Sequence, residues 1–417
     1  MNIFSLHRNI QIRILTSFLT RIVGSMIFPF MAIYFADKLG ESVAGILLLI
    51  NVGVSILTGF YGGYLADKVG RKKVMVWGQI LTVFSYVIMT FANSPWLDSV
   101  LLTFLMMLIN IVANGLINPT AEAMLIDVST KESRTLMYSL NYWAINASVM
   151  IGSLVGGFFF KQYRFELFIS LTIVAILTLI LVAFLMTEGY KPQTTEPRKI
   201  NILKDIAISY RTVMVDKLFI IFCIASTLIL TLEFQRNNYI GIRVEKEFIP
   251  ITLGFLQIDG MKMYSLLATE NTLIIVLLTI FMAKWVNKGP NHVMLTIGIA
   301  TQSIGFSLLA IGHSIELLLL AGLIQTIGEM IYVPVRQSML ADMVNEEARA
   351  SYMAINGLVF QGAKMLGTSG ILLGAAIGSY GMAITFLVCG FASFILFQIC
   401  HKRNAEVQVI KETEQSM

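Results

Sequence analysis

The chain has 417 residues, of which 56% are apolar and only 13% are Asp, Glu, Lys or Arg. Soluble domains carry roughly 25% charged residues, so this composition cannot supply a water-facing exterior. One very large soluble core is excluded as well, because cores divide into domains before this size and each would still need a charged surface. Composition therefore indicates an all-α membrane protein.

The sequence contains no pattern typical of an enzyme active site. No nucleophile–base set or Walker A motif is visible, so we expect no catalytic residue, no cofactor and no ATP hydrolysis. The three cysteines have no Cys-x-x-Cys spacing and no histidine cluster beside them, so we expect no metal site. The formal charge of +5 is carried mainly by connections between apolar stretches, and no nucleic-acid partner is expected.

Twelve apolar stretches are long enough to cross a bilayer, which takes about 20 residues. In chain order they lie near 12–36, 42–64, 74–93, 99–124, 137–160, 166–186, 215–240, 264–285, 292–312, 316–340, 351–377 and 381–400. Most of the 30 lysines and arginines fall in connections on the side that holds both termini. The positive-inside rule then predicts a multi-pass protein of the cell membrane with both termini cytoplasmic. We also expect a bacterial origin.

The second half of the chain repeats the first at an offset of 215 residues. The matches are Pro119 with Pro334, Asp127 with Asp342, Arg134 with Arg349, Asn141 with Asn356 and Gly152 with Gly367. Convergent loop chemistry is the alternative explanation. The repeat predicts an N-terminal six-helix bundle over 1–186, a cytoplasmic linker over 187–214, a C-terminal six-helix bundle over 215–400 and a cytoplasmic tail over 401–417.

The loop after the second predicted span reads GGYLADKVGRKKV, from Gly62 to Val74. It resembles the signature of the major facilitator superfamily, matching it at Gly63, Leu65, Asp67, Gly70, Arg71 and Lys72. Glycine suits a short connection between close helices, and the carboxylate and guanidinium can form a charge-assisted latch. The resemblance implies twelve transmembrane helices in two bundles related by pseudo-two-fold symmetry.

In that family the acid and the arginine of the motif form a network with a second acid at the cytoplasmic end of the fourth helix. Asp127 stands at that place in this chain. The resemblance therefore implies an intracellular gate made by Gly63, Asp67, Gly70, Arg71 and Asp127. A solvated basic loop is the alternative. The matching loop of the second half keeps Gly289 but has neither the acid nor the arginine, so the expected gate is asymmetric.

Further stretches of the sequence indicate which subgroup of that family the chain resembles. MIGSLVGG in the fifth span is similar to the antiporter motif, with Ser153 in place of proline, although small residues also serve ordinary helix packing. AMLIDVSTKESR and NYWAINASVMIG resemble the twelve-span drug:proton antiporters, in particular the LmrP-like multidrug exporters. In that subgroup an aspartate precedes the YWA triplet, whereas this chain has Asn141.

Ionisable residues inside the predicted spans are the main site candidates, because a charge at the bilayer centre costs roughly 2.5–3.5 kcal/mol on insertion scales. Glu329 lies near the middle of the tenth span and is the first candidate for proton coupling and cation recognition. A structural pair with Arg336 is the alternative. Glu233 either neutralises Arg236 one turn away or faces a cavity, and we expect Arg21 to meet one of these acids.

Asn110 and Asn114 begin a polar stripe on the fourth span, which either lines a cavity or bonds neighbouring helices. The favoured function is a monomeric, proton-coupled exporter of lipophilic or cationic small molecules, with protons as coupling ion and membrane lipid around it. A transporter of one specific metabolite and a membrane sensor without transport remain as alternatives. We count Asn141 among the coupling and substrate residues.

Overall fold

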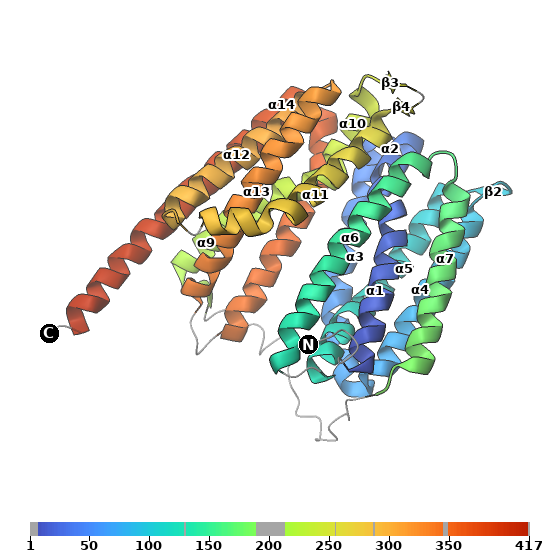
Figure 1. Cartoon of the computed structure of the whole chain (residues 1–417), viewed down its shortest axis with the longest axis horizontal. Helices are drawn as coiled ribbons and strands as arrows, with labels where there is room; N and C mark the ends of the chain where they lie inside the picture. The colour runs from blue at the N-terminus through green and yellow to red at the C-terminus, as the bar shows by residue number, and fades with distance from the viewer. Residues whose placement is uncertain are drawn as a thin grey trace. The chain divides into compact units, whose positions relative to one another are not determined.

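The protein is described from a computed structural model, which covers residues 7–128, 131–188, 213–254, 256–286, 288–344 and 349–415. Long helices dominate these residues, and the predicted all-α membrane fold is confirmed (Figure 1). Two short hairpins interrupt them: β1 (Asn93–Ser94) pairs antiparallel with β2 (Leu97–Asp98), and β3 (Ile251–Leu253) pairs with β4 (Leu256–Ile258).

The chain forms two compact units, one taking in residues 1–195 and 252–272 and the other residues 196–251 and 273–417. The helices of the first unit are α1 (Arg8–Ile27), η2 (Phe28–Phe30), α2 (Met31–Leu39), α3 (Glu41–Val69), α4 (Arg71–Ala92), α5 (Val100–Val128), α6 (Lys131–Phe159), α7 (Arg164–Ile180), the π-helix η3 (Leu181–Leu185) and the start of α11 (Gly260–Val286). Within it α1 packs against α6 and α7, and α5 packs against α3 and α4.

The second unit contains α9 (Lys217–Gln235), the π-helix η4 (Arg236–Ile240), α10 (Gly241–Glu247), the remainder of α11, α12 (Asn291–Ile311), α13 (Ile315–Met343) and α14 (Arg349–Gln415). The Asp216 carboxylate caps α9 by accepting the Phe219 N–H at 3.0 Å, which satisfies a free donor of the first turn. At Gly378 the φ angle is +68°, so α14 is two helices joined at a break that glycine accommodates without strain.

Ten helices of the described ranges are long and apolar enough to cross a membrane. One of them, residues 355–401, is interrupted at Gly378, and a shorter apolar helix covers residues 143–159. The chain is therefore a multi-pass membrane protein. The count of twelve spans and the boundaries of the two bundles stay predictions.

The two units repeat the same helix contacts at equivalent positions. Gly152 of α6 lies so close to α1 that an added Cβ would meet the Ile22 carbonyl oxygen at 2.4 Å. Its repeat partner, Gly367 of α14, lies equally close to Phe234 of α9, with a Cβ contact of 2.3 Å. Gly152 and Gly156 of MIGSLVGG thus allow α6 to approach α1 closely. Both repeat prolines, Pro119 and Pro334, lie inside helices, α5 and α13.

Replacing Gly152 by alanine should lower the melting temperature, because the new methyl group would collide with backbone of α1. Overpacking of this kind costs about 1–3 kcal/mol. The matched control is Gly53→Ala in α3, where an added Cβ meets nothing within 4 Å. Thermal unfolding of the purified protein in detergent measures both variants, and equal melting temperatures would contradict this account of the packing.

Candidate functional site

The second unit holds a group of charged and polar side chains inside two candidate membrane spans. Glu233 ends the regular part of α9, and Arg236 begins the π-helix η4 one turn later. Gln325, Glu329 and Tyr332 lie on α13 at spacings of four and three residues, which places them on one helix face. We call these five residues the polar cluster.

Arg236 joins the two helices of the polar cluster. Its Nη2 donates to the Gln325 Oε1 at 2.7 Å and lies 3.3 Å from the Glu329 Oε2. The two charged side chains are only 16% and 21% exposed, so water screens their attraction weakly. A π-turn at a functional position is common, because the extra residue re-aims the side chains that follow it.

Glu233 has a different partner from Glu329. The hydroxyl of Tyr332, a fully buried side chain, donates to the Glu233 Oε1. Glu233 is repelled by the charge of Glu329 and attracted by those of Arg236 and Arg336. The cluster therefore brings two carboxylates into one electrostatic environment, where a proton on either relieves the repulsion.

These contacts bear on the alternatives that the sequence left open, and the roles of Glu329 and Glu233 stay predictions. Glu329 forms its ion pair with Arg236 of the neighbouring helix rather than with Arg336 of its own helix. Glu233 takes its hydrogen bond from Tyr332 and not from Arg236. The sequence reasoning missed Gln325 and Tyr332. Their spacing from Glu329, one turn before and one turn after, was the signal that could have identified them.

The first unit carries a less acidic counterpart of the cluster. At the repeat offset Arg236 corresponds to Arg21, Gln325 to Asn110 and Glu329 to Asn114. The Asn114 amide donates to the Asn110 carbonyl oxygen at 2.9 Å and to its side-chain oxygen at 3.3 Å, both along α5. The arginine and the amides are thus present in both units.

The carboxylate at this repeat position is present in the second unit only, because the position of Glu329 is occupied by Asn114 in the first unit. Arg21 is exposed on α1, and the acid that attracts it within the first unit is Glu122 of α5. The expected meeting of Arg21 with Glu233 or Glu329 stays a prediction. Asn141 lies half-buried on α6.

The motif loop at the other end of the first unit contains a second ionic site. Gly70 joins α3 to α4 with a φ of +107°, a conformation that suits glycine. Arg71, the next residue, forms an ion pair with Asp127 near the end of α5. The side chain of Asp67 and the surroundings of Gly63 lie outside the described part of the chain. The structure therefore joins Arg71 to Asp127, and their role in a gate stays a prediction.

Residues that the sequence assigned to the linker also bind this loop. The Glu188 Oε2 accepts the backbone N–H of Lys72 at 2.8 Å, which places a carboxylate at the N-terminus of α4. Thr187 exchanges hydrogen bonds with Asn9, whose Nδ2 donates to the Thr187 carbonyl oxygen at 2.9 Å. The end of the sixth predicted span is thereby attached to the starts of α1 and α4.

Asp98, in the β1–β2 hairpin, is the centre of a third ionic site. Its Oδ2 lies 2.6 Å from the Lys38 Nζ, and its Oδ1 accepts from the Arg164 Nη2 at 3.1 Å. The hydrogen bond from Lys38, supported by the charge of Arg164, lowers the pKa of Asp98 below its usual value. These two contacts connect the C-terminal end of α2 and the N-terminal end of α7 to the hairpin.

Comparison with known proteins reveals three kinds of similarity. The family model described as Major Facilitator Superfamily matches residues 14–244 and 248–410. A Na(+), Li(+), K(+)/H(+) antiporter of Planococcus maritimus is 27% identical over 97% of this chain and 99% of its own length. Multidrug resistance protein MdtH of Salmonella typhimurium is 26% identical over 91% of each chain. A solved POT family transporter in complex with a thioalcohol-conjugated peptide shares the fold, with a TM-score of 0.76 at 15% identity over 97% of this chain and 99% of its own.

Substituting Arg236 by alanine should destabilise the protein, because it leaves the Glu329 charge without its partner in a poorly screened place. Loss of one member of such a pair costs about 3 kcal/mol. The double variant Arg236→Ala with Glu329→Gln should recover part of that loss, since both charges are then removed. Melting temperatures of the single and double variants measure the coupling, and strictly additive losses would show that the pair contributes nothing.

The lowered pKa of Asp98 predicts that the stability of the folded protein falls as the pH is lowered. A carboxylate whose folded pKa lies below its unfolded value of about 3.9 stabilises the fold above that pH. The contribution disappears as the pH falls through the folded value. Melting curves of wild type and Asp98→Asn should therefore differ most at neutral pH and converge in acid. Glu166→Gln, a change at an exposed acid of α7, is the control, and a difference that grows on acidification would contradict the assignment.

Proposed function

The chain belongs to the Major Facilitator Superfamily and is a transporter, and from that premise we propose that it is a proton-coupled antiporter that exports lipophilic or cationic compounds. The observation that carries the proposal is the polar cluster, in which Glu233 and Glu329 share one electrostatic environment inside the candidate spans. Buried carboxylates of this kind in a transporter are groups that take up and release protons. Relatives named as antiporters and as multidrug resistance proteins support the same reading.

The cluster suggests how exchange would be coupled. With both carboxylates charged it attracts a cation, and Arg236 then competes with the substrate for Glu329. Protonation of Glu329 would free Arg236 from its ion pair and remove the attraction for the substrate. A proton and a cation thus exclude one another at the same acid, which is the requirement for exchange driven by a proton gradient.

We assign Gly63, Asp67, Gly70, Arg71 and Asp127 to a gate on the cytoplasmic side, with both termini on that side. The ion pair of Arg71 with Asp127 and the bond from Lys72 to Glu188 support this assignment, because together they tie α4, α5 and the end of η3. Arg21, Asn110, Asn114, Asn141 and Arg336 are proposed to contribute to the substrate path. The bacterial origin and the monomeric state are also part of the proposal.

A second candidate function is the exchange of monovalent cations for protons. The similarity to the Planococcus antiporter favours it, because that alignment takes in nearly the whole of both chains. The same two carboxylates would serve, since Na⁺ and K⁺ also compete with protons for carboxylate oxygens.

Reconstituted vesicles with an imposed proton gradient distinguish the two functions. Dissipation of the gradient by ethidium, with none by NaCl or KCl, supports drug export, whereas the reverse result supports cation exchange. We expect Glu329→Gln to abolish the response to either substrate and Glu233→Gln to reduce it at least tenfold.

Glu316→Gln provides the matched control, because Glu316 is an exposed acid in the first turn of the same helix. It should transport at the wild-type rate. Undiminished exchange by Glu329→Gln would remove Glu329 from the coupling role, and ethidium efflux that is indifferent to the proton gradient would refute proton coupling itself.

A further inference from the structure

A groove opens between α12 and the second part of α14, away from the polar cluster. Its volume is about 390 Å³, and its walls are mainly apolar, formed by Ile299, Ala300, Ile304, Leu387, Phe391 and Phe394. Phe391 is 65% exposed and Ile304 is 47% exposed, so the groove is open at its side. Because both helices are candidate membrane spans, the open side faces the hydrocarbon of the bilayer.

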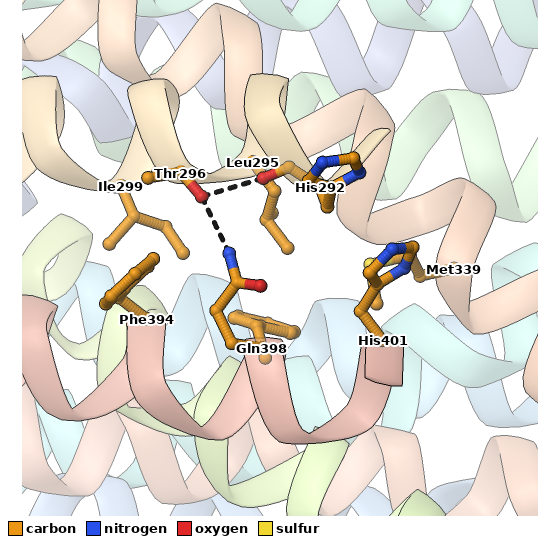
Figure 2. A pocket seen from close by; sticks show the side chains of 9 residues that line it. His292, Leu295, Thr296, Ile299, Met339, Phe394, Gln398 and His401 are labelled. Atoms are coloured by element: carbon orange, nitrogen blue, oxygen red, sulfur yellow. Dashed lines mark hydrogen bonds between the residues drawn. The ribbon is translucent and has the colours of Figure 1, made fainter. Parts of the chain in front are cut away.

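The groove continues at one end into a small pocket lined by both apolar and polar side chains. Thr296, Ile299 and Phe394 line both. Figure 2 shows His292 and Thr296 on one helix facing Gln398 and His401 on the other. The Gln398 Nε2 donates to the Thr296 Oγ1 at 3.0 Å, and the two histidine rings stack with their centroids 4.7 Å apart. The apolar groove thus ends at a set of hydrogen-bonding side chains.

Basic residues flank this pocket in the sequence. Lys284 and Lys288, both exposed, precede α12, and in the sequence Lys402 and Arg403 follow His401 directly. The positive-inside rule therefore places the histidine pair at the level of the cytoplasmic headgroups, and the groove extends from there toward the bilayer centre. Basic sites between membrane helices on this side attract anionic lipid headgroups.

We propose that this groove is a binding site for an anionic phospholipid. One acyl chain occupies the groove between α12 and α14, and the phosphate contacts the side chains of His292 and His401. A groove of this volume suits one flexible chain. A second copy of the protein would need a far broader contact, about 800 Å² on each partner. The site is independent of the proposed antiport.

Native mass spectrometry of the detergent-purified protein tests the site with two added lipids, dioleoyl-phosphatidylglycerol and dioleoyl-phosphatidylcholine. Wild type should retain one phosphatidylglycerol at least tenfold more strongly than phosphatidylcholine. Ala300→Phe fills the groove and should remove that bound lipid. The control Ala376→Phe, an exposed position on the first part of α14 outside the groove, should keep it. Ile304→Phe provides a second filling variant if the first does not fold.

The paired variant His292→Ala with His401→Ala should bind both lipids equally, because the groove remains while the headgroup contacts are lost. Unchanged phosphatidylglycerol binding in both filling variants would overturn the site. An unchanged preference in the histidine variant would overturn the headgroup assignment. A dimer that disappears on filling the groove would instead assign this face to a second copy of the chain and contradict the proposal.

Discussion

The ion pair between Arg236 and Glu329 is the interaction on which the proposed exchange in the second unit depends. A lone charge inside a membrane is expensive, so each of these side chains is tolerated because of the other and because Gln325 accepts a further bond from the guanidinium. The pair links η4, where the π-helix begins, to α13. In the proposed exchange, protonation of Glu329 removes its charge attraction for Arg236, and the guanidinium keeps its bond to Gln325.

The internal repeat explains why only one unit has this property. Both units keep an arginine and an amide at equivalent positions, whereas the position of Glu329 is Asn114 in the first unit. An amide can hold a hydrogen bond but cannot titrate. The first unit instead concentrates its ionic contacts at the ends of its helices, where Arg71, Asp127 and Glu188 join the motif loop and Asp98 joins the opposite hairpin. In the described residues, the second unit thus pairs two acids with an arginine inside its candidate spans, and the first unit has ion pairs at the ends of its helices.

Much of the architecture could be predicted from the sequence, because apolar runs, glycines and the motif loop are local signals. The helical membrane fold, the family and the proximity of Arg71 to Asp127 followed from them. The partners inside the polar cluster did not follow. The alternative that paired Glu329 with Arg336 considered neighbours on one helix, and nothing in the sequence indicated that Arg236 of η4 lies beside Glu329 of α13. Glu188 was assigned to the linker because its surroundings are polar, and its capping of α4 depends on a contact 116 residues away in the chain.

Proton release on substrate binding tests the central claim most directly. Tetraphenylphosphonium titrated into the detergent-solubilised protein in two buffers of different ionisation enthalpy reports how many protons leave as the cation binds. The account predicts that wild type releases a proton when the cation displaces it from the polar cluster, and that Glu329→Gln releases none. Cation binding with no proton release in wild type would contradict it.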